Sequence, residues 1–235
     1  VRGTRTYDMW RRDDFDPLSN EAAAELVAEV MDVIPKYTRL QRVQRDIPAD
    51  FIDAGVWKSN LRQLAWQKMD EHDWDCHCIR CREAGMNDEE PTDVSLDTIT
   101  YQAGGGTEHF ISFEDREQEL LVGFCRLRFP NVAASGASGS SSDLSDGDPV
   151  RRELEDAALV RELHVYGDQV AVGQSGEEGD QQHRGYGRRL LAEAERRARE
   201  AGYRKLSVIS GIGVRQYYRE KLGYHQDGPY VSKRL

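Results

Sequence analysis

The most informative part of this 235-residue chain is Gln182-His183-Arg184-Gly185-Tyr186-Gly187, with the amphipathic run 188–201 after it. Gly185 and Gly187 have no side chains to keep an anion away from the backbone. The first N–H groups of a following helix point at such an anion, with the positive end of the helix dipole behind them. The stretch therefore predicts a loop that holds a pyrophosphate at a helix start. The plainer alternative is a tight turn before a helix.

The run 188–201 has the pattern of a helix that packs flat against a sheet. Apolar and aromatic residues recur on one face, at Tyr186, Leu190, Ala194, Ala198 and Ala201. Glu193 with Arg197, and Glu195 with Arg199, are spaced as i,i+4 ion pairs on the other face. We therefore expect one buried face and one solvated face.

Strands and helices alternate around this helix. Gly202 is expected to end the helix of the run 188–201. Gly223 is expected to end a second helix at 214–221. We expect strands at 98–102, 109–114, 118–129, 159–166, 206–210 and 224–231. The order predicts an α/β (α+β) fold with a mixed central sheet. A Rossmann dinucleotide unit is the competitor, but it would require a third glycine and an acidic residue about 20 positions on, and 206–210 contains no acid.

Composition bounds the class of protein. The chain is 38% hydrophobic and carries a formal net charge of −10. No apolar run approaches the ~20 residues of a membrane span, so we expect a cytoplasmic protein without a membrane or DNA partner. The acidic residues are distributed unevenly along the chain. The Ser/Gly/Asp-rich segment 133–149 is expected to be a disordered insertion. An acidic surface with such an insertion suggests a salt-loving archaeal source.

Three cysteines form a second chemical signal. Cys76, Cys78 and Cys81 lie within six positions, and soft sulfur ligands in tetrahedral array suit Zn²⁺. The fourth ligand stays open among His72, His77 and the distant Cys125. The alternative is a set of free buried thiols in a reducing compartment.

Basic residues in the first third of the chain suggest an RNA surface. Arg80 and Arg82 flank the cysteines and could point at phosphate, or they could compensate the thiolate charge. Arg39, Arg42 and Arg45 recur at three-residue intervals, which fits an RNA-facing strip or a solvated helix flank.

Several motifs resemble a known family. Gln182, Gly185 and Gly187 match the acetyl-CoA signature of the GNAT acetyltransferase superfamily. The longer motifs 161–167, 208–218 and 222–230 look like the Elongator catalytic subunit, a tRNA-modifying enzyme. Upstream, 42–48 and 76–83 resemble the same family, so the likeness covers nearly the whole chain.

The resemblance implies a division of the chain. Residues 1–48 look like the tail of a radical-SAM domain, 49–90 like a zinc-binding linker and 91–235 like the acetyltransferase domain. The residue pattern itself predicts helices at 20–33 and 61–70. Family members hold S-adenosyl-L-methionine and a [4Fe-4S] cluster in an N-terminal domain that this sequence does not contain. We therefore expect a C-terminal fragment.

The resemblance also implies site residues. Backbone groups of Glu162, Leu163, His164 and Val165 would pair with the pantetheine arm, as an added strand does. Gln182, Arg184, Gly185, Tyr186 and Gly187 would hold the pyrophosphate of acetyl-CoA. Tyr217 and Tyr218 are candidates to contact the thioester or protonate the leaving thiolate, one of them being core packing. Glu162 is a candidate general base or a structural acid, and His164 fits a sheet histidine.

The implied function is delivery of the acetyl group to carbon 5 of the wobble uridine in tRNA as a carboxymethyl group. Expected partners are tRNA and either a second copy of the chain or Elongator-like subunits. Two alternatives use the same cofactor site: a protein lysine acetyltransferase of the histone type, and a noncatalytic acetyl-CoA or tRNA-binding module.

Overall fold

The computed structural model describes residues 1–43, 46–87, 90–130, 152–166 and 185–235. The chain divides into two compact units, Val1–Arg82 and Glu83–Leu235, and each is described by itself. The segment 133–149, expected to be a disordered insertion, lies outside the described residues. The expected boundaries after residues 48 and 90 stay predictions.

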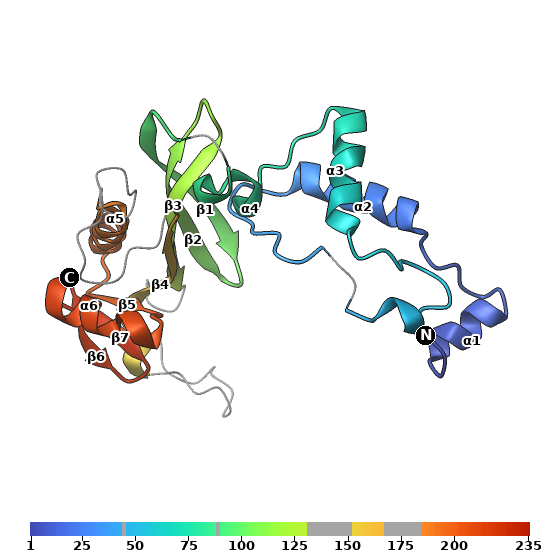
Figure 1. Cartoon of the computed structure of the whole chain (residues 1–235). Helices are drawn as coiled ribbons and strands as arrows, with labels where there is room; N and C mark the ends of the chain where they lie inside the picture. The colour runs from blue at the N-terminus through green and yellow to red at the C-terminus, as the bar shows by residue number, and fades with distance from the viewer. Residues whose placement is uncertain (44–45, 88–89, 131–151, 167–184) are drawn as a thin grey trace. The chain divides into compact units, whose positions relative to one another are not determined.

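The first unit is helical (Figure 1). Its helices are α1 (Arg5–Arg11), α2 (Asn20–Val33), α3 (Leu61–His72) and α4 (Ile79–Arg82). The helix expected at 20–33 is confirmed, and α3 extends the one expected at 61–70. Ser19 caps α2, since its Oγ accepts a hydrogen bond from the Ala22 N–H at 3.1 Å.

The cores of this unit are small. Ala28 and Met31 of α2 pack against Ala65 and Met69 of α3. A second cluster joins Ala23, Ala24 and Leu61. The partly buried residues Trp74, Cys76 and Cys81 pack against the first cluster, so the cysteine segment completes the helix pair.

The second unit is built on a seven-stranded mixed sheet in the order β1-β2-β3-β4-β5-β7-β6. Its strands are β1 (Val94–Ala103), β2 (Gly106–Asp115), β3 (Leu120–Pro130), β4 (Ala157–Val165), β5 (Lys205–Val208), β6 (His225–Asp227) and β7 (Tyr230–Arg234). The β4–β5 pair is parallel, and the other neighbouring strands are antiparallel. The predicted α/β class with a mixed sheet is confirmed.

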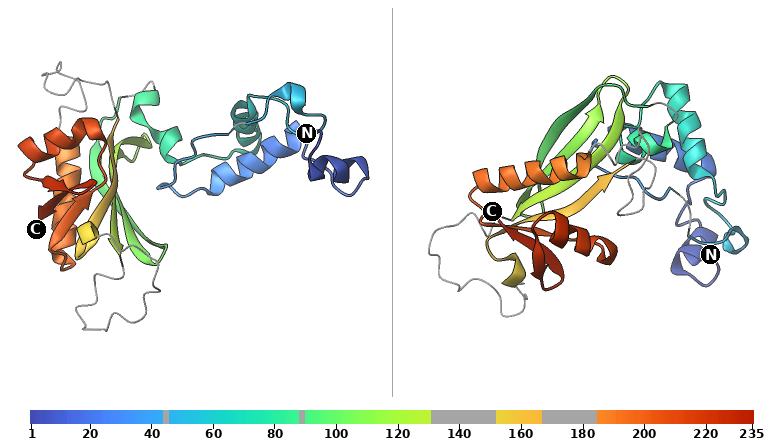
Figure 2. Two further views of the ribbon diagram at one scale, coloured as in Figure 1. Left: turned by 90° about the horizontal axis from the view of Figure 1, so that it is seen from below. Right: turned by 60° about the vertical axis from the view of Figure 1, so that its left-hand side comes forward.

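Helix α5 (Tyr186–Glu200) lies across one face of this sheet, and α6 (Arg215–Lys221) packs beside β6 and β7 (Figure 2). Leu190, Ala194 and Ala198 are fully buried in the core cluster, as their spacing predicted. Gly202 has a φ of 86°, which confirms the left-handed cap. No helix in the described part of the chain has the length and apolar character to cross a bilayer.

Two expectations about α5 need correction. Ala201 is exposed and does not extend the buried face. Glu195 is only 8% exposed, although its ion pair with Arg199 is present at 3.2 Å. Its carboxylate also accepts hydrogen bonds from the Tyr224 hydroxyl at 3.0 Å and from Lys233 Nζ. Glu195 therefore joins the helix to the C-terminal strands, a role that helical spacing could not reveal.

The single closing strand expected at 224–231 is wrong. The segment forms a hairpin, with β6 and β7 joined by a turn at Gly228, whose φ is 57°. The sequence Asp227-Gly228 carried this signal, because Asp-Gly pairs favour the positive φ values of tight hairpin turns.

Candidate functional site

Strands β4 and β5 separate at the site. They pair only from Ala157 to Val160, opposite Lys205 to Val208. The N–H of Ile209 donates to the Val160 carbonyl at 2.9 Å, and β4 continues to Val165 along β3 alone. Within the described residues, β4 beyond Val160 has no strand beside it on the β5 side. An extended ligand can therefore add its own polar groups to this edge.

A cleft of about 450 Å³ opens at this separation. It is lined by Leu163, Val165, Gly185, Gly187, Arg188, Leu191, Val214, Tyr217, Tyr218 and Leu222. The structure thus brings together residues of β4, the start of α5 and α6. Six of the residues predicted for the site are in this set.

The start of α5 is open toward the cleft. Gly185 is the N-cap residue of the helix with a φ of 71°, a conformation that favours glycine. A Cβ atom on Gly187 would meet Val165 Cγ2 at 3.6 Å and Leu163 Cδ2 at 3.8 Å, so this glycine faces the β4 wall. Helix N–H groups and the helix dipole at this point favour an anion.

The two tyrosines of α6 have different surroundings. The Tyr217 hydroxyl accepts a hydrogen bond from Arg188 Nε at 3.1 Å. Tyr218 is 7% exposed, and burial, followed by the nearby Cys125 and Tyr217, raises its pKa to about 12. Its ring packs edge-on against Tyr224 at 5.5 Å. Both tyrosines line the cleft, and Tyr218 also belongs to the core, so core packing and contact with a ligand do not exclude each other.

Arg188 was not identified from the sequence. It lines the cleft three residues after Gly185, one helical turn inside α5. That spacing from the glycine loop was the available signal, because residues three apart on a helix share a face. Its guanidinium adds a positive charge beside the helix start.

Comparisons with known proteins agree with this geometry. A model of the Radical_SAM C-terminal domain matches residues 1–71. A model of the Acetyltransferase (GNAT) family matches residues 66–224, more than half of the chain. The chain belongs to the GNAT acetyltransferase family.

Longer relatives match this GNAT chain over its whole length. The tRNA uridine(34) acetyltransferase of Methanocaldococcus infernus is 42% identical, and the chain covers 42% of that protein. Elongator complex protein 3 of Schizosaccharomyces pombe is also 42% identical, with 41% of its length covered. The chain therefore spans about two fifths of the length of these curated relatives.

A solved structure shares the fold of the chain. The archaeal Methanocaldococcus infernus Elp3 with an N-terminal deletion matches with a TM-score of 0.83 and 42% identity. The match covers 100% of this chain and 53% of the other. Together with the relatives, it confirms the resemblance to the Elongator catalytic subunit.

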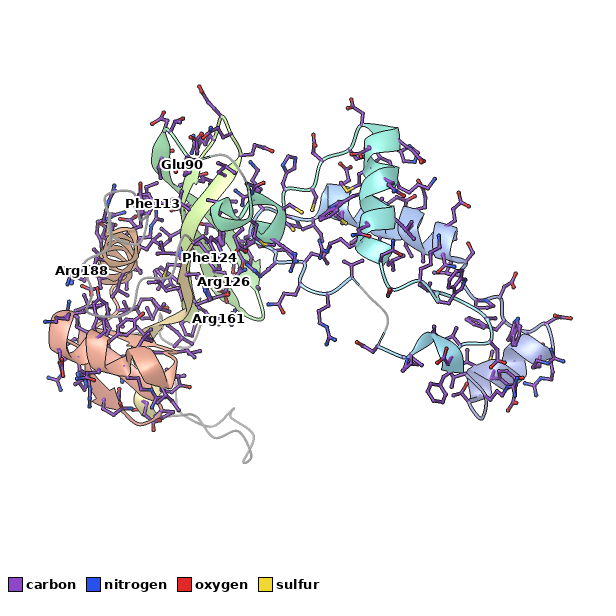
Figure 3. The ribbon with its side chains drawn as sticks, viewed as in Figure 1. Glu90, Phe113, Phe124, Arg126, Arg161 and Arg188 are labelled. Carbon is purple, nitrogen blue, oxygen red and sulfur yellow. The ribbon has the colours of Figure 1, made fainter. Side chains whose placement is uncertain are left out.

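Glu162 belongs to the other face of the GNAT sheet. Leu163 and Val165 line the cleft, whereas Glu162 pairs with Arg126 at 2.7 Å and with His164 at 3.1 Å. Figure 3 shows Arg126 and Phe124 on β3, on the side of the sheet away from α5, with Phe113 on the α5 side. Hydrogen bonds from His164 and then Arg126 lower the pKa of Glu162 to about 2. So weakly basic a carboxylate does not favour the predicted role of general base.

Other predicted cofactor residues have mixed positions. Gln182 and Arg184 lie outside the described residues. The Tyr186 side chain is buried in the core, with its ring 4.9 Å from that of Phe113, so only its backbone can serve a ligand at the helix start. His164 is exposed, and its ring stacks with that of Tyr166.

The three cysteines of the first unit converge. The sulfur atoms of Cys76, Cys78 and Cys81 all lie within 4.8 Å of one another. Hydrogen bonds among the three thiols lower the pKa of Cys78, mostly through Cys76 and then Cys81, and raise the pKa of Cys76 and of Cys81, so one thiolate is favoured at Cys78. Three such sulfur donors fit a Zn²⁺ ion.

The fourth ligand stays open. Among the described residues, no histidine or carboxylate joins the three sulfur atoms. His72 contacts Glu25 at 2.6 Å and stacks on Trp74. Cys125 is buried in the core of the second unit, where burial raises its pKa to about 12.

The predicted RNA-binding arginines differ in exposure. Arg82 is 3% exposed, and it donates to the His77 and Lys36 carbonyls, each at 2.9 Å. This structural role does not favour Arg82 as an RNA contact. Arg42 is exposed, Arg39 and Arg80 are partly buried, and Arg45 lies outside the described residues. The helix-flank alternative is wrong for the described part of this strip, since residues 36–43 contain no helix.

Proposed function

We propose that this chain binds acetyl-CoA in the α5 cleft and supplies its acetyl group for carboxymethylation at carbon 5 of the wobble uridine in tRNA. The observation that carries the proposal is that the β4 edge, which no described strand covers beyond Val160, meets the glycine-opened start of α5 in one cleft. The choice of tRNA as the substrate is supported by two relatives, a tRNA uridine(34) acetyltransferase and Elongator complex protein 3.

The cleft residues would hold the cofactor in three places. The pyrophosphate lies at the N-terminus of α5, where Gly185 and Gly187 leave the backbone accessible and Arg188 adds a positive charge. The pantetheine arm runs along Glu162 to Val165 and pairs with their backbone groups. The thioester then lies near Tyr217 and Tyr218.

Tyr218 holds its proton at neutral pH, because its pKa is about 12. A thiol has a pKa near 8.5, so full proton transfer from Tyr218 to a thiolate is unfavourable. The hydroxyl therefore acts as a hydrogen-bond donor that orients the thioester. Tyr217, held by Arg188, is the second candidate for this contact.

Further cofactors belong to the proposal. Cys76, Cys78 and Cys81 would hold a structural Zn²⁺ ion, which supplies cross-linking and no chemistry. S-adenosyl-L-methionine and a [4Fe-4S] cluster would be held by residues outside this chain and would supply the radical chemistry. The partners are tRNA and either a second copy or Elongator-like subunits, in the cytoplasm. A salt-loving archaeal source stays a prediction.

Calorimetry with acetyl-CoA and its desulfo analogue tests the cofactor site. We expect a heat of binding that is lost when Gly187 is replaced by valine, while an Ala192→Ser control on the exposed side of α5 binds normally. Absence of heat with correctly folded chain would overturn the site.

Mass spectrometry of tRNA tests the reaction. Cells lacking the full-length gene should lose carboxymethyl-type modification of the wobble uridine, and the gene should restore it. An unchanged level of wobble-uridine modification in the deleted cells would contradict the proposal. Acetylation of a histone-like peptide without tRNA would instead favour a lysine acetyltransferase.

A further inference from the structure

The first unit contains a cleft of its own, which we name the α3 cleft, with a volume of about 430 Å³. It is lined by Gln41, Arg42, Val43, Ser59, Asn60, Arg62, Gln63, Trp66 and Arg80. All of these residues belong to the Val1–Arg82 unit. The lining includes three arginine guanidinium groups, three side-chain amides and the indole of Trp66.

The charge of the α3 cleft is positive. Three arginines line it, and no lining residue is acidic. Arg42 pairs with Asp46 at 3.3 Å, but both side chains are more than two thirds exposed, so the pair is weak. Among the described residues, Arg80 has no ion-pair partner. The cleft therefore attracts an anion in a chain whose net charge is −10.

Arg62 is held in place with one nitrogen unused. Its Nη2 donates to the Leu40 carbonyl at 2.7 Å, and its guanidinium lies 5.9 Å from the centre of the Trp66 ring. Its Nη1 is buried and has no hydrogen-bond partner among the described residues. Because a buried donor normally has an acceptor, this nitrogen is a candidate donor to an oxygen atom bound beside Arg62.

Trp66 supplies an aromatic surface. It lies one turn after Arg62 on α3 and is 45% exposed, although its ring is large and apolar. Unpaired bases stack on such rings, and arginines beside the ring bind the adjoining phosphates. Asn60, Gln63 and Gln41 add amide groups that can hydrogen-bond the edge of a base.

We propose that the α3 cleft holds one unstacked nucleotide of a single-stranded RNA segment. The base stacks on Trp66, Arg62 donates to it or to its ribose, and Arg42 and Arg80 bind the flanking phosphates. The proposal rests on the proposed function for the class of RNA, tRNA, whose loops present unstacked nucleotides. The sequence predicted only phosphate contacts by arginines in this region. The proposed cleft adds a binding site for a base.

Fluorescence anisotropy with a labelled short oligouridylate tests the site in the 235-residue chain. Trp66→Ala should weaken binding about tenfold, because base–aromatic stacking contributes that much, and Trp66→Phe should recover most of the affinity. The matched control is Trp57→Ala in the same unit, which removes an indole that is 55% exposed and does not line the cleft. Equal weakening by the two alanine variants, or no weakening by either, would overturn the proposal.

The salt dependence tests the phosphate contacts. Arg80→Gln should reduce the slope of log affinity against log salt by about 1, while Arg12→Gln, an exposed arginine elsewhere in the unit, should leave it unchanged. An unchanged slope for Arg80→Gln would contradict its assignment. Circular dichroism of each variant verifies folding, and Gln63→Ala provides a second cleft variant if Trp66→Ala does not fold.

Two further arms separate the outcomes. If uridine monophosphate binds in a Trp66-dependent way and the oligouridylate does not, the cleft is a site for a free nucleotide and the RNA proposal is overturned. Acetyl-CoA calorimetry is run on the same variants. Normal acetyl-CoA heat with Trp66-independent RNA binding rejects the α3 cleft and leaves the proposed function. Trp66-dependent RNA binding without acetyl-CoA heat supports the α3 cleft and rejects the proposed acetyl-CoA site.

Discussion

The two compact units of this chain are stabilised in different ways. In the second unit, one continuous cluster of buried residues joins α5 and α6 to β2, β3, β4, β5 and β7. In the first unit, the described buried residues form smaller clusters, with Ala28, Met31, Ala65 and Met69 in one and Ala23, Ala24 and Leu61 in another. Units with so little apolar burial commonly rely on a metal or a disulfide, and here three cysteine sulfurs converge beside the larger cluster.

The two candidate sites therefore depend on different structural supports. The α5 cleft, for which we propose acetyl-CoA as the ligand, is built on a sheet that its own core holds together. The α3 cleft is built on a helix pair that the cysteine segment completes. Loss of metal should therefore disable one site and spare the other.

Removal of the metal ligand set should have the largest effect. Cys78→Ser, or a strong chelator, should remove bound zinc and unfold the Val1–Arg82 unit, because structural zinc contributes on the order of 10 kcal/mol to such folds. Acetyl-CoA binding should persist. Elemental analysis and calorimetry measure the two outcomes, with Cys125→Ala as the control that keeps its zinc. Zinc content unaffected by Cys78→Ser would remove the metal assignment.

A cavity in the core beside α5 should destabilise the second unit and spare the first. Leu190 is fully buried, so Leu190→Ala should destabilise the second unit by about 3 kcal/mol and leave the zinc content unchanged. Urea unfolding followed by the two units' separate signals measures this. Leu26→Ala in α2, where the side chain is 49% exposed, is the matched control and should cost less than about 0.5 kcal/mol. Loss of zinc in Leu190→Ala would show that the units do not fold separately.

Acid should affect the second unit through Glu162. Its pKa is lowered from 4.5 to about 2 by His164 and Arg126, so its contribution to stability is present above pH 4.5 and is lost as the pH falls toward 2. With the side chain 34% exposed, we expect that contribution to be about 1 kcal/mol. Glu162→Gln should flatten the acid limb of the stability profile. Asp14→Asn, which removes an exposed ion pair with Arg12 in the first unit, should not change it.

The smallest effect on stability should accompany Gly187→Ala. A Cβ atom there makes only ordinary contacts, the nearest at 3.6 Å, so the free energy of unfolding should change by less than about 0.5 kcal/mol. Acetyl-CoA affinity should still fall, because the methyl group occupies the cleft. Calorimetry on this variant separates packing from ligand contact. Unchanged affinity would mean that the cofactor does not approach this glycine.

Periodicity and glycine positions predicted most of the second unit. The apolar spacing of Leu190, Ala194 and Ala198 identified the buried face of α5, and Gly202 marked its end. The prediction of one strand at 224–231 missed the hairpin because it gave no weight to the turn signal Asp227-Gly228 inside that segment. The buried role of Glu195 depends on Tyr224 and Lys233, which are distant in sequence.

The sites were predictable to a smaller extent. The cysteine spacing indicated the convergence of three sulfurs, since short separations limit where the side chains can go. The α3 cleft could not be predicted, because Gln41, Arg62 and Arg80 come from three segments that only the fold brings together. The low basicity of Glu162 likewise depends on Arg126 from the neighbouring strand.

Because Cys125 is buried, the rate at which its thiol reacts reports how often the sheet opens. This thiol is completely enclosed by the core and its pKa is about 12, so it cannot meet an alkylating reagent while β3 is in place. Covalent labelling at Cys125 therefore proceeds only through opening of the second unit. Mass spectrometry of that one peptide over time of exposure to the reagent reports how often the sheet opens, without any engineered residue.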